Sequence, residues 1–308
     1  MPPTYKILRG TDYADSFNET DAFALDVLVG LSSPKKKLSS KYFYDERGSE
    51  LFNKISELPE YYPTGCELEI IQRNSGTITR YVDYDQPFNL VELGAGFSKK
   101  TTTLLDHFIQ QNLNFQYVPI DICKGAMHLL MEELRSQFPK LEANGLVTDY
   151  FNGLKWLNNR SKRKNLVLFM GSSIGNFTHA ENCVLLRNLW NCLNHEDVLM
   201  IGFDLKKDID VLLQAYNDSQ GVTREFNLNL LHRINRELGG NFDVTKWRHF
   251  GTYDVFSGGM ESYLVSLEKQ SVFIEKIGRW FEFESWEPVH TEYSYKYLVS
   301  EIKTETSR

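Results

Sequence analysis

The sequence has 308 residues, of which 42% are hydrophobic and 24% are charged. These proportions are typical of a globular protein with a sizeable core, in one large or two modest domains. The net charge of −7 disfavours a nucleic-acid partner, and no apolar run is long enough to cross a bilayer, so we expect neither nucleic acid nor a membrane as partner. The four scattered cysteines form no C-x-x-C pair and indicate buried thiols of a cytoplasmic protein, not a metal site. We expect a monomer.

The N-terminal flank, residues 20–85, is predicted to be mainly helical. Its helical segments are "DAFALDVLVGLS", "GSELFNKISEL" and "CELEIIQRNSGTITRYV".

Residues 88–205 alternate between apolar runs and amphipathic segments. The runs are "FNLVELGAG", "FQYVPIDI", "GLVTDY", "NLVLFMGSSIGNF" and "DVLMIGFDLKKD", and the segments between them include "KKTTTLLDHFIQQ", "GAMHLLMEELRSQF" and "AENCVLLRNLWNCL". Strands that alternate with helices predict an α/β fold with a parallel, doubly wound sheet. Ligands of such sheets lie outside the carboxyl ends of the strands, where the polar residues of these runs stand.

The C-terminal third changes character twice. Residues 208–238 predict two helices, and residues 247–297 predict β-strands with a hairpin around Gly278. An α+β segment therefore interrupts the α/β core. We expect one domain formed by residues 70–205 plus 295–308, and a second formed by residues 1–69 plus 206–294.

The last predicted strand, "HTEYSYKY", alternates strictly. Thr291 and the three tyrosines that follow it at every second position fall on one side, while Glu292, Ser294 and Lys296 fall on the other. Pattern alone makes this a half-exposed strand.

The first strand–helix turn carries two glycines that allow a ligand to approach the backbone. Gly94 and Gly96 follow the strand, and Asp121 ends the next strand, where a carboxylate suits a ribose diol. The full G-x-G-x-x-G of many NAD-binding proteins is absent, because Lys99 occupies its third position.

The third strand ends in a second acid followed by an aromatic ring. Asp149 is a candidate acceptor for an adenine amino group, and Tyr150 is a candidate cover for the ring. Together with the glycine turn they favour S-adenosylmethionine over NAD. Each acid taken alone could instead be a helix N-cap.

The fourth strand ends in "GSSIGNF", which crowds Gly171, Ser173 and Asn176 together. Asn176 could hydrogen-bond the carboxylate or the amine of an amino acid. The competing interpretation is that Asn176 caps the helix that begins near residue 179.

The sequence resembles the L-histidine Nα-methyltransferases of ergothioneine biosynthesis, together with fungal relatives that methylate a tryptophan-derived amine. The resemblance covers about residues 22–300 and rests on "KYFYDERGSELFNKISELPEYYPT", "FMGSSIGNF", "GFDLKKD", "INREL" and "HTEYSYKY", among other blocks. It implies a Rossmann-like methyltransferase domain with an α+β substrate domain, S-adenosyl-L-methionine as cofactor, and trimethylation of L-histidine to hercynine.

The resemblance also implies roles for individual residues. Tyr44 would lie near the amine, Asn176 and Tyr216 would meet the carboxylate, and Glu292 with Ser294 would bind the imidazole. The cofactor residues would be Gly94, Gly96, Lys100, Asp121, Asp149 and Tyr150. The residues around the acceptor would be Tyr44, Phe52, Tyr61, Gly171, Ser173, Asn176, Tyr216, Ser262, Glu292 and Ser294, with no metal.

Some positions depart from the family pattern. Ser262 stands where the family commonly has methionine, which changes the size and polarity of the acceptor site, and Gly65-Cys66 replace Arg-Thr. The family also continues past "SYKY" through a helix and further strands, whereas this chain ends at "SEIKTETSR". Two alternatives therefore remain: a methyltransferase of another amine such as a tryptophan-like amino acid, and a shortened, non-catalytic binder of S-adenosylmethionine or amino acid.

Overall fold

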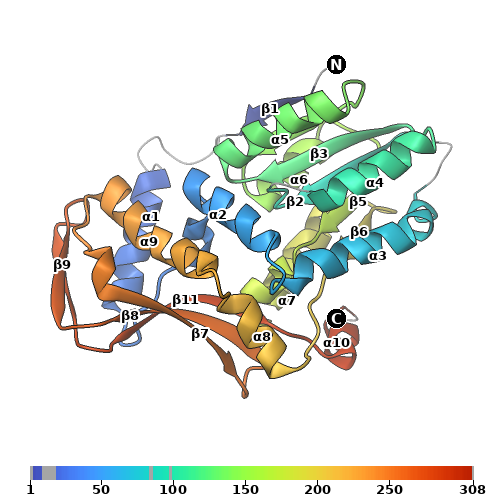
Figure 1. Cartoon of the computed structure of the whole chain (residues 1–308). Coiled ribbons are helices and arrows are strands. Elements are labelled where there is room, and N and C mark those ends of the chain that lie inside the picture. The colour runs from blue at the N-terminus through green and yellow to red at the C-terminus, as the bar shows by residue number, and fades with distance from the viewer. Residues whose placement is uncertain (1–2, 9–18, 83–85, 97–98, 307–308) are drawn as a thin grey trace. The chain divides into compact units, whose positions relative to one another are not determined.

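The computed structural model describes residues 3–8, 19–82, 86–96 and 99–306. The chain divides into two compact units, each drawn in Figure 1. The first unit comprises Met1–Thr11, Tyr62–Asp204 and Lys303–Arg308, and the second comprises Asp12–Tyr61 and Leu205–Ile302.

The unit boundaries differ from the expected domain boundaries because of two helices and one strand. The helix α3 (Tyr62–Thr79) packs on α4 (Lys99–Gln110). Its first eight residues, expected in the second domain, therefore belong to the first unit. The strand β1 (Thr4–Ile7), which the sequence pattern did not predict, pairs with β4 (Asn144–Val147) in the same unit. The last helix, α10 (Val299–Thr306), crosses the boundary between the units.

Among its described residues, the first unit has a parallel sheet of six strands in the order β1-β4-β3-β2-β5-β6. Its further strands are β2 (Phe88–Leu93), β3 (Phe115–Asp121), β5 (Lys164–Phe169) and β6 (Val198–Ile201). From β4 to β6 the order is that of a doubly wound, Rossmann-like sheet, with the switch between β2 and β5. The predicted α/β class is thus confirmed, and all five predicted strands are present.

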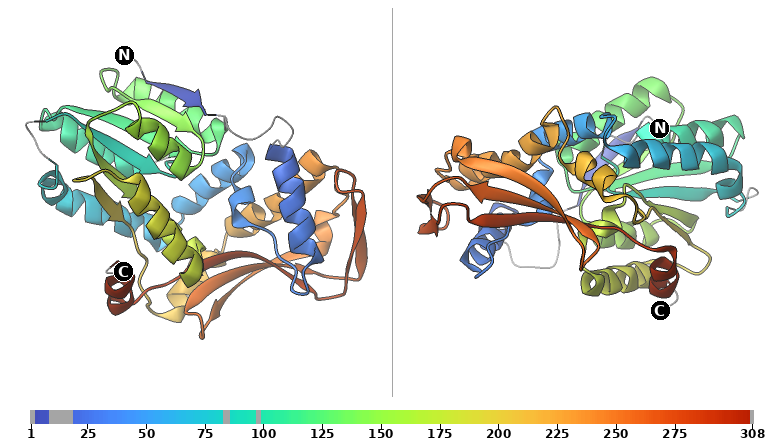
Figure 2. Two further views of the ribbon diagram at one scale, coloured as in Figure 1. Left: turned by 180° about the vertical axis from the view of Figure 1, so that it is seen from behind. Right: turned by 60° about the horizontal axis from the view of Figure 1, so that its bottom comes forward.

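Helices cover both faces of this sheet. In Figure 1, α3, α4 and α5 (Lys124–Gln137) lie in front of the strands, and one apolar cluster joins their buried side chains to the sheet. The view from behind in Figure 2 shows α6 (Tyr150–Asn158) and α7 (His179–Cys192) on the other face. With both faces covered, the strands are mostly apolar and deeply buried, as in β2, where every residue is buried, including the polar Asn89 and Glu92.

The second unit combines helices with antiparallel strands. Three strands form a sheet in the order β11-β8-β7, and β9 pairs with β10 in a separate hairpin whose turn contains Gly278, as predicted. The helices are α1 (Glu19–Ser32), α2 (Glu46–Ser56), α8 (Ile209–Tyr216) and α9 (Val222–Leu238); the strands are β7 (Trp247–Asp254), β8 (Gly259–Ser266), β9 (Gln270–Ile274), β10 (Arg279–Phe283) and β11 (Pro288–Tyr295). Short 3-10 turns lie at Ser40–Phe43 and Val244–Lys246 in this unit, and at Ser173–Asn176 in the first unit.

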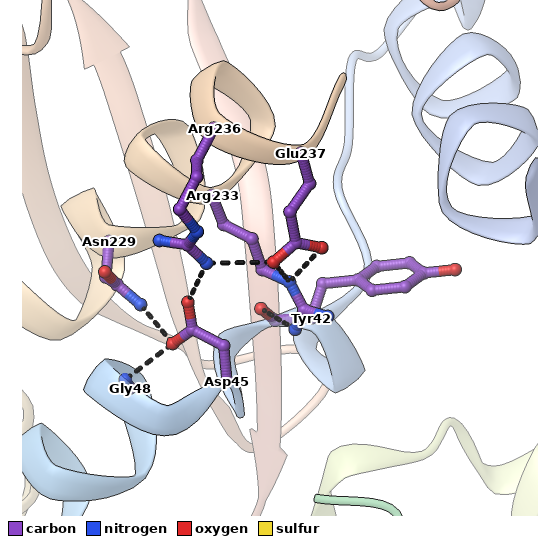
Figure 3. Close-up of polar contacts among 7 residues, drawn as sticks. All are labelled: Tyr42, Asp45, Gly48, Asn229, Arg233, Arg236 and Glu237. Carbon is purple, nitrogen blue, oxygen red and sulfur yellow. Dashed lines mark hydrogen bonds and ion pairs between the residues drawn. The ribbon is translucent and has the colours of Figure 1, made fainter. Parts of the chain in front are cut away.

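A polar cluster ties α2 to α9 in the second unit (Figure 3). Asp45 caps α2 by accepting from Gly48 N at 2.7 Å, and it also accepts from Asn229 Nδ2 at 2.8 Å and Arg236 Nη2 at 2.5 Å. Burial alone would raise the pKa of Asp45, but these donors and the positive charge of Arg236 hold it below its ordinary value. The cluster fixes the chain just after Tyr44, a predicted site residue.

The cysteine prediction is half wrong. Cys123 and Cys192 are buried, but Cys66 on α3 and Cys183 on α7 are exposed, because both lie on helix faces that turn away from the core.

Candidate active site

The turn after β2 has the backbone form that the two glycines were predicted to allow. Gly94 has φ +71°, and a Cβ at this position would lie 2.9 Å from Tyr150 Oη. Gly96 has φ +48°, and a Cβ there would meet no atom within 4 Å. A side chain at Gly94 would therefore be strained and would collide with Tyr150, whereas the space beside Gly96 is open. Gly94 follows β2 and Tyr150 follows β4, and the fold brings them together although β3 lies between these strands in the sheet.

Asp121 closes the other side of this turn. It is 9% exposed, and its carboxylate accepts from Gly96 N at 3.0 Å and from Cys123 N at 2.8 Å. Burial raises the pKa of Asp121, while these backbone donors oppose the rise. The two carboxylate oxygens offer about four acceptor sites, so acceptor capacity remains for a ribose hydroxyl after the bonds from the N–H groups of Gly96, Cys123 and Ile122 are made. The buried carboxylate and the open space at Gly96 fit the ribose of an adenosine-type cofactor.

Asp149 caps α6. Its Oδ1 accepts from Phe151 N at 3.1 Å and Asn152 N at 3.0 Å, and its Oδ2 accepts from Asn152 Nδ2 at 2.6 Å. Asp149 is therefore a helix cap, as the competing interpretation predicted. Its exposed carboxylate can accept a hydrogen bond from a ligand only in addition to these three bonds. Tyr150 packs edge-on against Phe169, with ring centroids 5.6 Å apart.

A buried glutamate links Lys100 to the loop after β5. Glu67 on α3 pairs with Lys100 Nζ at 2.5 Å and accepts from Gly171 N at 2.7 Å. Gly171 has φ +76°, and a Cβ there would lie 3.6 Å from Lys100 Nζ and 3.4 Å from Ser173 Oγ. The structure thus brings Lys100, Gly171 and Ser173 together around Glu67. Sequence reasoning missed Glu67, because no local motif marks it.

Asn176 is not a helix cap. Thr178 caps α7 and forms a capping box with Glu181, in which each side chain bonds the other's backbone N–H. Asn176 ends the preceding 3-10 turn and is half-buried. The competing interpretation of Asn176 is thereby removed, and its amide lies at the strand-end edge of the sheet.

The second unit gathers the predicted aromatic residues into one series. Tyr44 and Phe52 have ring centroids 5.7 Å apart, Phe52 and Tyr61 6.1 Å, and Tyr61 and Tyr216 6.5 Å. Phe226 on α9 packs against both Tyr44 and Phe52 at 5.7 and 5.9 Å and was missed from the sequence. These residues come from α2, α8, α9 and the segments beside α2, so only the fold could join them.

The predicted alternation of β11 is wrong at Thr291. The pairing with β8 shifts between His290 and Glu292, which marks a bulge. Thr291 is buried and donates to Asn227 Oδ1 on α9 at 2.9 Å, so it does not stand with the tyrosines. The bulge thereby separates Thr291 from Tyr293, which stacks on Tyr295 at 5.4 Å.

Glu292 lies on β11 opposite Ser262 of β8. Ser262 Oγ lies 3.4 Å from Glu292 Oε2, a long hydrogen bond. Burial raises the pKa of Glu292 to about 7, although the positive charge of Lys296 and the bond from Ser262 oppose the rise. A carboxyl group of this pKa can change its protonation near neutral pH, which is common at functional sites.

Ser294 lies at the centre of a buried triangle. Its Oγ accepts from Tyr216 Oη at 2.6 Å and from Lys296 Nζ at 2.9 Å, and Lys296 also donates to Tyr216 Oη at 2.9 Å. The Tyr216 hydroxyl, expected to meet a carboxylate, is therefore engaged by neighbours of its own unit. Lys296 was noted only for its side of the strand, and the resemblance assigned it no role.

Two features are absent from the part of the chain that the structure describes. Within residues 3–8, 19–82, 86–96 and 99–306, no group of three or more His, Cys, Asp or Glu side chains could hold a metal ion. Among the described helices, none combines the length and apolarity needed to cross a bilayer.

Comparison with known proteins gives consistent matches. Residues 23–308 match the model of a family described as histidine-specific methyltransferase, SAM-dependent. A histidine N-alpha-methyltransferase of Mycolicibacterium smegmatis is 34% identical, over 96% of this chain and 90% of that protein. Ergothioneine biosynthesis protein 1 of Schizosaccharomyces pombe is 30% identical over 89% of this chain, which spans 37% of that protein. A 4-dimethylallyltryptophan N-methyltransferase of Claviceps purpurea is 28% identical, over 66% of this chain and 60% of that protein.

Proposed function

This chain belongs to the histidine-specific, SAM-dependent methyltransferase family, and we propose that it transfers three methyl groups to the α-amine of L-histidine and so forms hercynine, in ergothioneine biosynthesis. The observation that carries the choice of acceptor is the pair on β11, Glu292 and Ser294, a half-buried carboxylate and a buried hydroxyl two residues apart on one strand. An acceptor oxygen and a hydroxyl donor match the N–H and the bare nitrogen of a neutral imidazole. We call Glu292 and Ser294 the ring-binding pair.

The first unit would hold the cofactor. Asp121 would accept from the ribose hydroxyls, and Gly94 and Gly96 would let the cofactor approach the backbone. Asp149 and Tyr150 would lie at the adenine. Lys100, oriented by Glu67, would meet the carboxylate of the cofactor's methionine part, because it is a cation at the strand-end edge. When bound, S-adenosylmethionine supplies a methyl group on a sulfonium.

The acceptor ammonium must lose a proton before each transfer, because only the neutral amine is a nucleophile. That proton would pass to water, so the chain has to position the amine rather than supply a strong base. Tyr44 would lie near the amine, Asn176 and Tyr216 near the carboxylate, and Phe52 and Tyr61 beside the side chain. Gly171 and Ser173 would contact the acceptor, and Ser262 would back the ring-binding pair. Positioning of this kind supplies most of the rate gain when no proton-transfer group is needed.

The trimethylated amine of the product is a cation without any N–H group. Aromatic faces stabilise such a cation within about 6 Å, while directional acceptors gain nothing from it. The series Tyr44, Phe52, Tyr61 and Tyr216 presents such faces in a continuous run. Successive transfers would then proceed without a polar group that opposes the growing bulk and fixed charge.

Incubation with S-adenosylmethionine and a panel of free amino acids tests this proposal. We expect a mass gain of three methyl groups on histidine, and little or no gain on the other amino acids. A gain on tryptophan and none on histidine would replace the proposed acceptor. Absence of any gain, together with retained binding of S-adenosylhomocysteine, would favour a non-catalytic binder.

A second acceptor, a tryptophan-like amine, has one observation in its favour. Ser262 is small, is 1% exposed, and backs Glu292 where the resembling family commonly has methionine. The Claviceps relative acts, by its name, on a dimethylallyltryptophan. An indole offers an N–H to Glu292 but no acceptor to Ser294. Ser294→Ala therefore distinguishes the two acceptors, because it should weaken the binding of histidine and leave the binding of tryptophan unchanged.

We further propose that the enzyme works as a monomer in the cytoplasm, on a small-molecule acceptor and without a nucleic-acid partner. The free thiols and the net charge of −7 support this. Light scattering on the purified protein would test the monomer, since a mass near 36 kDa is expected from the sequence mass of 35.8 kDa.

A further inference from the structure

Lys296 is a buried lysine that the proposed chemistry does not use. It is 2% exposed, and removing an ammonium from water is costly unless hydrogen bonds and neighbouring charge compensate it. Its Nζ lies 4.8 Å from the centroid of the Tyr216 ring and donates to both Tyr216 and Ser294. It also lowers the pKa of Glu292. Lys296 therefore acts on both members of the ring-binding pair.

The direction of the hydrogen bonds decides what Ser294 can offer. An ammonium has donors only, so Lys296 must donate to Ser294 Oγ. The bond of 2.6 Å from Tyr216 also runs toward Ser294, because a phenol is a stronger acid than an aliphatic hydroxyl. A serine hydroxyl has two acceptor sites and one donor. Both acceptor sites are filled, and the O–H is what Ser294 has left for a ligand.

We propose that Lys296 and Tyr216 make Ser294 a fixed donor, so that this site takes its azole substrate in the neutral form, with an N–H toward Glu292 and a bare nitrogen toward Ser294. The inference rests on the proposed function, because it places the acceptor's ring against the ring-binding pair. A protonated imidazole carries an N–H on both nitrogens and would set one of them against the Ser294 O–H. The ammonium of Lys296 would repel it as well.

Several groups around the triangle can titrate with the ligand. Glu292 on β11 and Lys296 just after it are the charged groups, and Tyr216 on α8 is a phenol. On β7, burial lowers the pKa of His249 to about 4, which keeps that ring neutral above pH 5. The neighbouring β8 and α9 present Ser262 and Asn227, which do not titrate. The titration of these protein groups affects the binding of both ligands. The ratio of the two Kd values therefore isolates the effect of protonating the ligand itself.

The test measures, by calorimetry with S-adenosylhomocysteine present, the Kd of histidine and of β-(1,2,4-triazol-3-yl)alanine at pH 8 and pH 5.5. The triazole keeps an N–H and a bare nitrogen and stays neutral over this range. An imidazole of pKa near 6.5 is about nine-tenths protonated at pH 5.5, so the ratio of the histidine Kd to the triazole Kd should rise about tenfold. A constant or falling ratio would overturn the inference. Failure of histidine to bind at pH 8 would overturn the proposed function and this inference with it.

Variants test the role of Lys296 itself. Lys296→Met frees an acceptor site on Ser294 and removes the positive charge, so the tenfold rise should shrink to about twofold or less. Lys269→Met is the matched control, because Lys269 is exposed and pairs with Glu284 at 2.8 Å elsewhere in the same unit; it should keep the full rise. Should Lys296→Met fail to fold, Tyr216→Phe removes the other donor and serves the same test. A full tenfold rise in the folded Lys296 or Tyr216 variant would overturn their assigned role.

Discussion

The two groups of candidate site residues are built in different ways. In the first unit the site is largely backbone: Asp121 accepts from three main-chain N–H groups, and Gly94 and Gly96 expose the chain itself. In the second unit the site is formed by contacts between side chains, such as the hydrogen bond between Tyr216 and Ser294, which are 78 positions apart in the sequence. The first kind of site is encoded within a few residues of a strand end, while the second depends on a whole layer of tertiary packing.

This difference predicts that single substitutions can impair cofactor binding and acceptor binding independently. A substitution at the strand ends should weaken cofactor binding and leave acceptor binding unchanged. A substitution on β11 should weaken acceptor binding and leave cofactor binding unchanged. The variants below test that separation.

Asp121→Asn should have the largest effect, a loss of about a hundredfold or more in affinity for S-adenosylhomocysteine. The amide would place an NH₂ group against a backbone N–H and would remove an acceptor for the ribose, and each charged hydrogen bond contributes about 1.5–3 kcal/mol. Calorimetry measures it, with Asp106→Asn, an exposed acid on α4, as the control. Unchanged affinity would remove Asp121 from the site.

Glu292→Gln should lower the affinity for histidine about thirtyfold and the affinity for S-adenosylhomocysteine by less than twofold. The lost contact is one charge-assisted hydrogen bond, and the variant also removes a carboxylate whose pKa Lys296 lowers. Glu282→Gln, an exposed glutamate on β10, is the matched control. Equal losses for both ligands would contradict the separation and would indicate a general loss of structure.

The same difference explains what could be predicted from sequence. The five strands and the loop glycines follow from short-range pattern, because alternation and positive φ are local properties. Glu67 and Lys296 carry no local signal, since each gains its role from partners far along the chain. The bulge at Thr291 also escaped the pattern, because a rigid period of two cannot contain an extra residue.

Asp45→Ala should lower the free energy of unfolding by about 1.5 kcal/mol, because it removes the cap of α2 together with the bonds to Asn229 and Arg236. Thermal denaturation measures it. Asp208→Ala, which removes an exposed cap of α8, should cost about half as much.

The Asp45 effect has a sign in pH. The folded pKa of Asp45 lies below its ordinary value of 3.8, so its contribution is complete above pH 3.8 and is lost as the pH falls through the folded pKa. The gap in stability between the wild type and Asp45→Ala should therefore close in acid. A gap that stays constant below pH 3.8 would mean that the ionised carboxylate is not its source. Affinity for S-adenosylhomocysteine near neutral pH should stay within twofold, since Asp45 belongs to the second unit.

Ser262→Ala should have the smallest effect, a loss of less than about threefold in histidine affinity, because its bond to Glu292 is 3.4 Å long and therefore weak. The loss should depend on pH. Ser262 lowers the pKa of Glu292, so the variant raises that pKa further above about 7 and leaves less of the carboxylate ionised at pH 7. The Kd for histidine should then differ from the wild type at pH 7 and converge with it by pH 8.5. A tenfold loss at both pH values would instead mean that Ser262 contacts the ligand directly, and that the ring-binding pair is a trio.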